Sequence, residues 1–389
     1  ICHQTPRMNE AANTLRVVAL GTYDKSKPRN RILLQGLREN GVHVIECHHD
    51  VWGNVEDKSQ VSGMTAKFRI FWRFFGAYPV LIYRYLCCEK HHAVLIGYLG
   101  LFDVLVLWPF VRIRRAALFW DVFLSLYNTM VEDRALVGRY NPLAWALWLM
   151  EWLALRLVDQ ALMDTKAHTD YLVKTYRCPA HRVARLFVGV EPPRFDLAAR
   201  GLRPAGQAEV PKRVLFYGQF IPLHGIEYIV QAAKLTENEN LHWKLVGRGQ
   251  EATKIRRLIE ELQPANLEWI EWVDYDELAA CLANCHIALG IFGTTDKARR
   301  VIPNKVFQIV MAGRPLITAD TNAIRELLDE CGPVRFVPAG DAPALAQAAL
   351  AMAESYPVGE SYPREILCEI LPRTIGQRLA SLIREKVRR

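Results

Sequence analysis

The sequence predicts an α/β protein built from two Rossmann-like domains that face each other across a cleft. Short apolar strands alternate with helices in two separate runs, one before residue 190 and one after residue 212. A Pro-, Gly- and Ala-rich passage without hydrophobic periodicity lies between the runs. Strands that alternate with helices form parallel sheets with right-handed crossovers. Two such runs predict two domains, with ligands at the carboxyl ends of the strands, inside the cleft.

The first run predicts an N-terminal domain over residues 1–190. Its expected strands lie in RVVAL, VHVIECH, AVLIGY, AALFWDV, QALMDT and RVARLFVGV. Helices are expected at 28–40 and 142–157, and each begins with a proline, which suits the first helical position because its missing N–H has no partner there. The chain does not begin with Met, so Met8 is a candidate for the true start.

Residues 191–211 are predicted to be a linker and residues 212–360 the C-terminal domain. The expected strands of this domain are KRVLFYG, LHWKLVG, LEWIEW, HIALGIF and PLITAD, with helices between them. Residues 361–389 form a final helix beyond the second run, and we expect this helix to cross back to the N-terminal domain.

Composition and charge narrow the class of protein. Of the 389 residues, 51% are hydrophobic and 23% charged, which is a globular composition. The net charge of +8 permits an anionic substrate, an acidic membrane surface or nucleic acid. A nucleic-acid enzyme is the least favoured class, because the cations cluster at predicted cleft loops and form no stripe. The nine cysteines do not pair by spacing, which predicts reduced thiols in a cytosolic protein.

Two segments raise the question of a membrane. Residues 94–114 are apolar and long enough for a span, but Asp103 and Pro109 interrupt them, so a buried strand, a loop and a helix are expected instead. Residues 66–86 mix basic and aromatic side chains, as an interfacial helix does. A core helix with snorkelling arginines explains this second segment equally well.

The stretch VIPNKVFQIVMAGRPLITAD predicts a helix that Pro303 opens and Gly313 ends, followed by a strand. Lys305 and Gln308 are three residues apart, so they project from one side of its first turns. The start of a helix carries positive partial charge, and an anion would dock there. The alternative is that both side chains are solvated and that Pro303 and Asn304 only cap the helix.

The second half of the chain carries several motifs in one register. They are FYGQFIPLHGIEYIVQAAK, KLVGRGQE, WIEWVDYDELAACLANCHIALGIF and FQIVMAGRPLI. Over roughly residues 212–353 these motifs resemble the donor-binding domain of glycosyltransferase family 4. The resemblance implies the GT-B fold, a nucleotide diphosphate sugar as donor, an acceptor-binding first domain, and transfer with retention of the anomeric configuration.

Four positions depart from the family's pattern. The family carries two glutamates separated by seven residues, and the matching positions here are Arg300 and Gln308, so this E-x7-E motif is degenerate. An arginine and a lysine of the family match Gln219 and His224. The histidine can still donate a hydrogen bond in place of the lysine.

A donor site remains chemically possible with these substitutions. Charge builds on the leaving diphosphate in the transition state, and cations, a helix N-terminus or backbone amides can stabilise it. We expect Lys305 to pair with a phosphate and Gln308 to bind a ribose hydroxyl. The resemblance places the nucleobase beside the backbone of Val273 and Asp274. The remaining expected donor-binding residues are Gln219, His224, Gly293, Thr294 and Arg300.

No metal is expected at this site, because Lys297, Arg299 and Arg300 supply cations for the leaving group. The adjacent His48 and His49 are not a usual ligand set. The donor is expected to be linked to UDP or GDP, although backbone recognition of the base leaves no sequence trace that separates them from ADP.

The acceptor site is expected in the first domain. In the loop at 21–31, Tyr23, Arg29 and Arg31 are candidates to close over the diphosphate or to grip an anionic acceptor, and a solvated surface turn is the equal alternative. Asp121 ends a strand at the cleft, where it would orient or deprotonate the acceptor hydroxyl. It would otherwise cap the next helix. The charged run Glu132-Asp133-Arg134 fits an ordinary surface cluster equally well.

The sequence therefore predicts a glycosyltransferase that moves a sugar to a hydroxyl of a saccharide or lipid-linked acceptor, in polysaccharide biosynthesis. We expect a cytoplasmic protein, with peripheral contact at the inner face of the membrane as a further hypothesis. Two alternatives stay open. One is a GT-B-fold binding protein or partner subunit without catalysis, which the missing acid pair motivates. The other is a sugar-nucleotide epimerase of GT-B shape.

Overall fold

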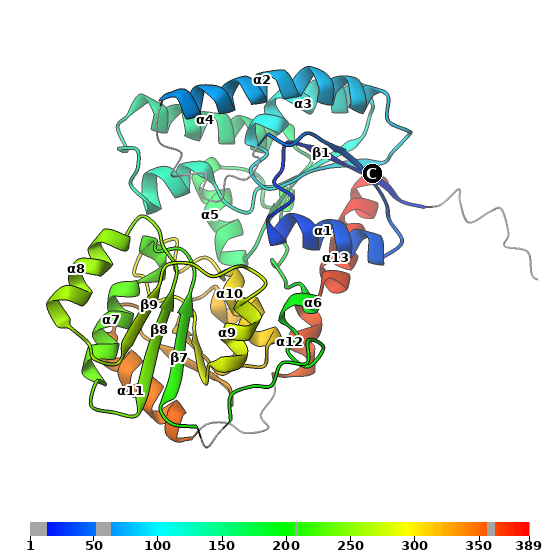
Figure 1. Ribbon diagram of the computed structural model, residues 1–389. Helices are drawn as coiled ribbons and strands as arrows, with labels where there is room; N and C mark the ends of the chain where they lie inside the picture. The colour runs from blue at the N-terminus through cyan, green and yellow to red at the C-terminus, as the bar shows by residue number, and fades with distance from the viewer. Residues whose placement is uncertain (1–13, 52–63, 207–208, 356–361, 389) are drawn as a thin grey trace, which may run out of the picture.

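The computed structural model describes residues 14–51, 64–206, 209–355 and 362–388. Its chain forms two α/β domains, one above the other in Figure 1. The candidate start at Met8 lies outside the described residues.

The first domain is built on a six-stranded parallel sheet in the order β2-β1-β3-β4-β5-β6. Helices cover both faces, which is why the strands are almost continuously apolar. Helices α1 and α13 pack on one face, and α2, α3, α4 and α5 pack on the other. The strands are β1 Arg16–Gly21, β2 His43–His48, β3 Ala93–Ile96, β4 Ala117–Asp121, β5 Gln160–Met163 and β6 Val183–Arg185. The helices are α1 Pro28–Glu39, α2 Met64–Leu86, α3 Leu101–Ile113, α4 Pro142–Leu157, α5 Lys166–Tyr176 and α13 Pro372–Arg388.

The second domain has its own six-stranded parallel sheet, in the order β12-β11-β10-β7-β8-β9. Helices α7, α8 and α11 pack on one face, and α9 and α10 pack on the other. The strands are β7 Lys212–Tyr217, β8 Leu241–Val246, β9 Leu267–Ile270, β10 Ile287–Leu289, β11 Leu316–Ala319 and β12 Val334–Val337. The helices are α7 Ile226–Leu235, α8 Ala252–Leu262, α9 Leu278–Asn284, α10 Asn304–Met311 and α11 Ala342–Glu354.

The strand orders fix where each sheet can bind a ligand. In the second sheet, β7 lies next to β10, and the crossovers on either side of this pair run in opposite directions. In the first sheet the corresponding pair is β1 and β3. Such switch points open a crevice at the carboxyl ends of the strands. Gly218 follows β7 and Gly290 follows β10, so neither strand end carries a side chain at this point.

The segment between the domains is more ordered than its composition suggests. It contains the short helix α6 Pro192–Phe195, and Phe195 is fully buried, with its ring 5.6 Å from that of Tyr275. This part of the linker is packed, because Phe195 and Leu197 enter the core that also holds α10.

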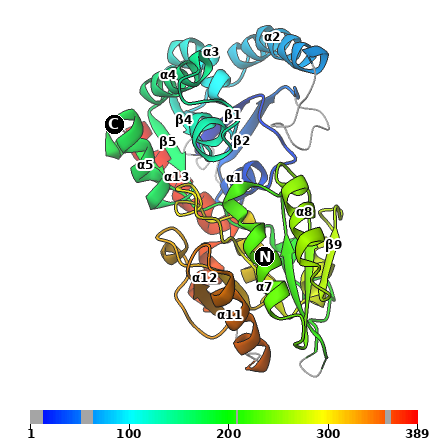
Figure 2. The same cartoon turned by 90° about the vertical axis from the view of Figure 1, so that its left-hand side faces the viewer.

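The chain returns to the first domain at its end, through α12 Arg364–Glu369 and α13. Helix α13 packs along α1, where Gly36 and Gly376 face each other at close range. A Cβ at Gly376 would lie 2.0 Å from the carbonyl carbon of Gly36, so only glycine lets the two helices approach this closely. Figure 2 shows α13 near α1, as the contacts between these two helices require.

Some elements differ from the sequence expectation in detail. Residues 94–114 form β3, a turn and α3, as expected, and no helix in the described ranges is long and apolar enough to cross a bilayer. Pro303 precedes α10 and does not open it. A π-helix at Asn128–Asp133 follows β4, and the sequence analysis did not predict it.

Candidate functional site

Lys305 and His224 meet at the carboxyl end of β7. Gly218 follows this strand with φ +142°, a conformation that favours glycine. A Cβ at Gly218 would lie 3.2 Å from Lys305 Nζ and 3.4 Å from His224 Cε1. The glycine therefore leaves room for two nitrogen-bearing side chains, one from α10 and one from the 3-10 turn Pro222–His224. This is the switch point of the second sheet.

Lys305 is a buried lysine that forms no ion pair within the described ranges. Only 5% of the residue is exposed. Its Nζ lies 3.6 Å from the centroid of the Phe216 ring and 3.5 Å from the carbonyl oxygen of Gly290. Burial lowers the pKa of Lys305 well below its ordinary value of 10.5. A buried ammonium of this kind is stabilised strongly by an anion, so the alternative of a solvated side chain is wrong.

One ring nitrogen of His224 is already used in a hydrogen bond within the protein. Its Nδ1 makes a short hydrogen bond to the carbonyl oxygen of Gln219, and a carbonyl only accepts, so Nδ1 carries the proton. Burial, followed by the nearby charge of Lys305, lowers the pKa of His224 well below its ordinary value. The expectation that neutral His224 donates to a phosphate is therefore wrong for this geometry, because Nε2 is left as an acceptor. The side chain of Gln219 is exposed.

Gln308 lies in a buried relay of hydrogen bonds. Its Oε1 accepts from the Tyr217 hydroxyl at 2.9 Å, and its Nε2 donates to the Tyr275 hydroxyl at 3.1 Å. The Tyr275 hydroxyl donates to Glu191 Oε2 at 3.2 Å, and Glu191 forms an ion pair with Arg31 at 2.7 Å. The relay links the first domain to α10 through the segment between the domains. Gln308 is only 6% exposed, so it is no solvated position.

The expected nucleobase segment borders this relay. Val273 is half-buried against the core of the second domain, and Asp274 is exposed, with its carbonyl accepting from Glu277 N at 2.9 Å. Tyr275 follows them and contacts Gln308. The structure thus brings the segment and Gln308 together.

The glycine-containing loop after β10 packs on the turn that carries His224. Gly293 N donates to the carbonyl oxygen of Leu223 at 3.2 Å. A Cβ at Gly293 would lie 2.5 Å from that same oxygen, so the close approach requires glycine. Thr294 is exposed beside Gly293.

The same loop also contacts the first domain. Lys297 Nζ donates to Thr129 Oγ1 at 2.8 Å and lies 3.6 Å from Asp133 Oδ2. Thr295 Oγ1 donates to Asp133 Oδ1 at 3.2 Å. Burial lowers the pKa of Lys297 to about 8, and the charge of Asp133 opposes this shift. Thr129 and Asp133 lie on the π-helix, which therefore faces the second domain and is no surface cluster.

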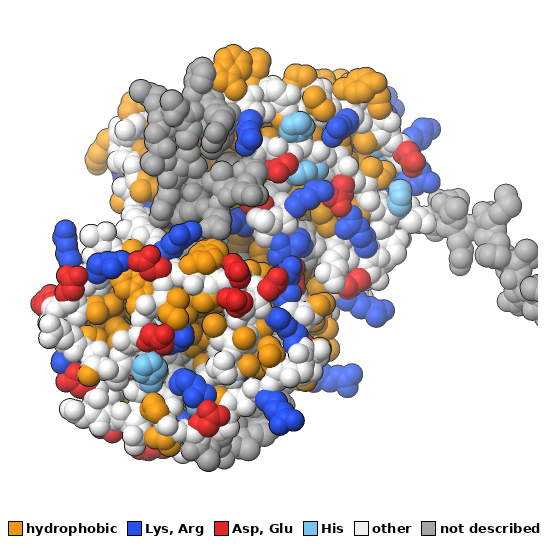
Figure 3. All heavy atoms as spheres, viewed as in Figure 1, with side chains coloured by type: hydrophobic (Ala, Val, Ile, Leu, Met, Phe, Trp, Pro, Cys, Tyr) orange, Lys and Arg blue, Asp and Glu red, His pale blue; other side chains and the backbone are white. Residues whose placement is uncertain are grey.

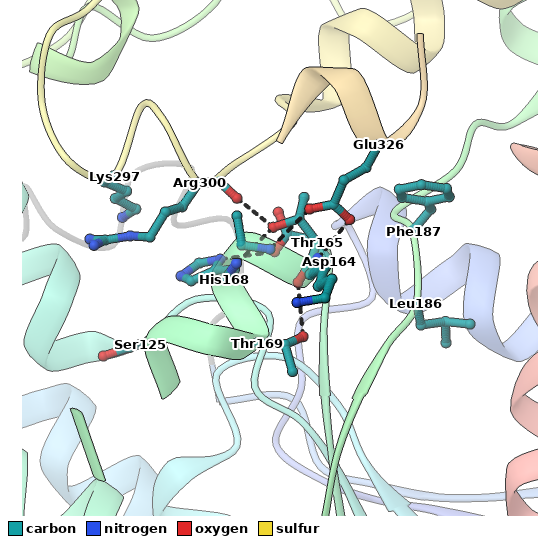
Figure 4. Close-up of polar contacts among 12 residues, drawn as sticks. Ser125, Asp164, Thr165, His168, Thr169, Leu186, Phe187, Lys297, Arg300 and Glu326 are labelled. Carbon is teal, nitrogen blue, oxygen red and sulfur yellow. Dashed lines mark hydrogen bonds and ion pairs between the residues drawn. The ribbon is translucent and has the colours of Figure 1, made fainter. Parts of the chain in front are cut away.

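Arg300 belongs to the loop after β10, and its side chain packs on Tyr171 of helix α5 in the first domain. Its guanidinium lies 4.1 Å from the centroid of the Tyr171 ring, and its carbonyl oxygen accepts a short hydrogen bond from Thr165. Figure 4 shows Lys297 and Arg300 across from Thr165 and His168. His168 Nδ1 lies 2.8 Å from Asp164 Oδ1. We call Asn128, Asp133, His168, Lys297 and Arg300 the seam cluster.

Arg29 and Asp121 form a buried ion pair inside the first domain. Arg29 Nη2 lies 2.7 Å from Asp121 Oδ1, and the two side chains are 1% and 0% exposed. Arg29 Nη1 also donates to the carbonyl oxygens of Leu186 and Phe187, both at 2.7 Å. Neither side chain reaches solvent in this conformation, so the catalytic role expected for Asp121 and the ligand-gripping role expected for Arg29 have no support from geometry. Both stay predictions.

The other expected acceptor-site residues also have protein partners. Tyr23 is 2% exposed, and its hydroxyl donates to Glu46 Oε2 at 3.3 Å. Burial raises the pKa of this hydroxyl above its ordinary range. Arg31 belongs to the relay of Gln308. At Tyr23 and Arg31, the loop at 21–31 therefore packs against the protein and is not a solvated turn.

Sequence reasoning missed the π-helix and its partners. Asn128, Thr129 and His168 were not singled out, although SLYNTMVEDR is a polar run directly after β4, at the carboxyl edge of the first sheet. That position was the available signal. In the part of the chain that the structure describes, no three His, Cys, Asp or Glu side chains converge as a metal-ligand set.

Among the comparisons with known proteins, a match to a family model covers the second domain. Residues 211–355 match the family model described as glycosyl transferases group 1. A curated relative, the putative colanic acid biosynthesis glycosyl transferase WcaI of Escherichia coli K12, is 27% identical over 112 residues. That match covers 28% of this chain and only 27% of the relative.

Solved structures match the whole architecture. Sucrose-phosphate synthase from Thermosynechococcus elongatus superposes with a TM-score of 0.69 at 15% identity, over 96% of this chain and 98% of that one. Anabaena HepE, solved with UDP and glucose, superposes with a TM-score of 0.65 at 12% identity, over 95% of this chain and 100% of that one. Residues 211–355 are thus a glycosyl transferases group 1 domain, in a chain with the two-domain fold of GT-B glycosyltransferases.

Proposed function

We propose that this chain transfers a sugar from a nucleotide diphosphate sugar to a hydroxyl of a saccharide or lipid-linked acceptor. The observation that carries the proposal is Lys305, a buried lysine at the switch point of a glycosyl transferases group 1 domain, which an anion beside it would hold in the ammonium form. The described chain supplies no carboxylate for this ammonium, and a diphosphate is an anion that suits it.

The leaving group explains why a cation is needed there. The bond between the anomeric carbon and the phosphate oxygen breaks, and its electron pair stays on that oxygen. The oxygen of the acceptor hydroxyl bonds to the carbon, and its proton passes to the departing phosphate oxygen. Lys305 and the N-terminus of α10 would stabilise the charge that develops on the diphosphate. Because these groups supply positive charge, we propose that no metal ion takes part. Retention of the anomeric configuration is proposed from the family resemblance.

The relay residues suit the nucleoside end of the donor. Gln308 Nε2 donates one proton to Tyr275 and would use its second proton to bind a ribose hydroxyl. The backbone around Val273 and Asp274 lies next to it through Tyr275. UDP is the first nucleotide to test, because HepE was solved with UDP and glucose, and GDP is the second. The colanic acid relative supports a role in polysaccharide biosynthesis.

A lipid-linked acceptor agrees with the outer surface of the first domain. Helices α2, α3 and α4 lie side by side at the top of this domain, where Figure 3 shows hydrophobic and basic side chains. We call their exposed surface the three-helix face. Its exposed large hydrophobic side chains are Trp72, Phe75, Val80, Tyr83, Leu86, Phe102, Val106, Ile113, Leu143, Trp145, Leu149 and Leu153.

The charges on this face fit an anionic lipid surface. The three helices contain only two acids, Asp103 and Glu151, and these are 1% and 2% exposed. Arg73, Arg84 and Arg112 are exposed among the aromatic residues. Exposed tryptophan, tyrosine and arginine without exposed acid is the composition of an interfacial membrane surface. We propose that the three-helix face binds the cytoplasmic face of a membrane.

The test of the proposed activity is release of nucleotide from a panel of donors. The protein is incubated with UDP-glucose, UDP-galactose, UDP-N-acetylglucosamine and GDP-mannose, with and without a mixture of saccharide and lipid-linked acceptors. We expect UDP or GDP release that increases when acceptor is present. Conversion of a donor to its epimer without acceptor would instead identify an epimerase. Nucleotide binding without turnover of any donor would identify a binding subunit.

A further inference from the structure

A helix of the first domain is capped by a side chain of the second domain. Helix α5 begins after Thr165, whose Oγ1 accepts from His168 N at 3.0 Å. The two earlier N–H groups of the helix, at Lys166 and Ala167, donate to Glu326 Oε2 and Oε1, at 2.7 and 2.9 Å. The first N–H groups of a helix have no partner inside it, so Glu326 completes the cap from the other domain.

Glu326 is held in place for this contact. It ends the 3-10 turn Ile324–Glu326 after β11, and Ile324 is buried in the core of the second domain. Its side chain is only 14% exposed, and Arg185 Nη1 of β6 lies 3.4 Å from Glu326 Oε2. In Figure 4 the side chain extends from this turn toward Thr165. The carboxylate thus contacts two backbone amides and one guanidinium of the first domain.

The neighbouring contacts show which edges of the sheets meet here. Thr165 follows β5 and donates to the carbonyl oxygen of Arg300, in the loop after β10. In the seam cluster, Lys297 of that loop contacts Asp133, which follows β4. Glu326 follows β11. The carboxyl edges of the two sheets therefore face each other, and the contacts named here are polar.

The cap is the strongest of these contacts by its chemistry. Hydrogen bonds with one charged partner are roughly twice as strong as neutral ones, and the start of a helix carries positive partial charge that favours a carboxylate. Glu326 makes two such bonds and an ion pair. Lys297 makes one hydrogen bond, to Thr129, and lies 3.6 Å from Asp133. Domains joined by polar contacts move relative to each other by default, so the strongest polar contact has the largest effect on their arrangement.

The proposed nucleotide site does not include this contact. Lys305, Phe216, Gly218 and Gly290 all belong to the second domain, so the first domain contributes none of these groups. The acceptor is expected in the first domain, and transfer requires the two sites to meet. Loss of the cap should therefore affect transfer and leave nucleotide binding unchanged.

We propose that Glu326 is a positioning residue that holds the two domains together through the first turn of α5. The inference rests on the proposed function in one respect, because the arrangement that Glu326 stabilises is the one in which the sugar passes to the acceptor. The contact itself involves no substrate, so its test includes readouts that need no turnover.

Two variants test the cap. Glu326→Ala removes the carboxylate, and Glu326→Gln keeps one accepting oxygen without the charge, so it should restore part of what the alanine variant loses. The matched control is Glu330→Ala, at an exposed glutamate of the same segment. Thermal unfolding shows whether each variant is folded. Glu326→Gln keeps the volume of the side chain and carries the test if the alanine variant does not fold.

Three measurements follow the domains and the reaction. Small-angle X-ray scattering gives the radius of gyration, hydrogen exchange gives the protection of the first turn of α5, and donor turnover with the acceptor panel gives kcat and KM. We expect Glu326→Ala to increase both the radius of gyration and the exchange in this turn. It should lower kcat/KM for the acceptor about tenfold or more, the factor that loss of a charged hydrogen bond produces, and leave UDP affinity within about twofold. Glu330→Ala should match the wild type.

The outcomes separate a positioning role from a merely structural one. A larger radius of gyration in Glu326→Ala that Glu326→Gln partly reverses would support the inference. A folded Glu326→Ala protein with the wild-type radius of gyration would overturn it, whatever its unfolding temperature. Absence of turnover in every protein, the wild type included, would contradict the proposed function alone, because scattering and exchange still report on the cap.

Discussion

At the scale of single residues, the proposed donor site depends on Lys305, because the acid pair of the family it resembles is degenerate here. The position of the family's first glutamate holds Arg300, which stacks on Tyr171 of the first domain. The second holds Gln308, whose amide serves two tyrosine hydroxyls. With both acids replaced, the positive charge near the diphosphate site rests on a buried lysine. We therefore expect the protonation state of Lys305 to affect nucleotide affinity.

Nucleotide binding should be coupled to proton uptake through Lys305. Burial holds the pKa of Lys305 well below 10.5 in the free protein, and a diphosphate beside it would raise that pKa. A group whose pKa rises on binding takes up a proton in the interval between the two values, so nucleotide affinity should fall as pH rises through this interval. Titration with UDP in two buffers of different ionisation enthalpy measures the uptake. Lys305→Met should abolish it, and an unchanged uptake in this variant would assign the proton to another group.

At the scale of elements, α1 is attached to the first domain by polar and steric contacts that its sequence does not reveal. Arg29 in its first turn joins Asp121 at the end of β4 and the carbonyl oxygens that follow β6. Toward the C-terminal end of α1, Gly36 packs against Gly376 of α13. Helix α1 thus connects the sheet of the first domain to the last helix of the chain.

The ion pair of Arg29 predicts the effect of changing Asp121. Asp121→Ala leaves a buried guanidinium without its carboxylate, so we expect a loss of about 3–5 kcal/mol in the free energy of unfolding. The double variant Arg29→Met, Asp121→Leu should recover part of that loss. Urea unfolding of the two single variants and the double variant gives the coupling. If Asp121 only stabilises the fold, the double variant keeps donor turnover, whereas a folded double variant without turnover would support the catalytic prediction.

The contact between α1 and α13 makes a second prediction at this scale. Gly376→Ala places a methyl group against the backbone of Gly36, and we expect the resulting overpacking to cost about 1–3 kcal/mol. Ser381→Ala on the same helix is exposed and serves as the control. Thermal unfolding compares the two. Equal midpoints would show that α13 does not pack on α1 in solution as described.

At the scale of the whole molecule, two buried carboxylates connect the helices of the three-helix face to loops at the carboxyl edge of the first sheet. Asp103 of α3 accepts from Thr22 N at 2.8 Å, in the loop that follows β1. Glu151 of α4 accepts from Ser125 at the start of the π-helix. Each carboxylate points inward and fixes a loop, which leaves the outer surface of the helices without acidic charge.

Membrane binding should depend on this outer surface. We expect the protein to float with vesicles of phosphatidylcholine mixed with phosphatidylglycerol, less with phosphatidylcholine alone, and less at high salt. Removing the apolar side chains in Trp145→Ser, Leu149→Ser should weaken binding about tenfold or more. Trp272→Ser removes an exposed tryptophan of the second domain and should have no effect. Equal flotation of both variants would refute the proposed face.

The pattern of strands and helices could be predicted from the sequence. What could not be predicted has physical reasons. The strands of both sheets are apolar runs because helices cover both faces, and such runs are readable without a structure. The spacing of Lys305 and Gln308 correctly placed both on one helix, but spacing does not report burial. Arg29 and Asp121 are 92 residues apart, so nothing local indicated that each is the partner of the other. The π-helix depends on Glu151 of a later helix, which is a tertiary contact.

The most direct test of the central claim is calorimetric titration of the wild type and Lys305→Ala with UDP, GDP and ADP, without added metal. The control is Lys234→Ala, at a partly exposed lysine of α7 that pairs with Glu237. We predict that one nucleotide binds selectively, that Lys305→Ala weakens it about tenfold or more, and that Lys234→Ala does not. Unchanged affinity in a folded Lys305→Ala protein would contradict the donor site described above.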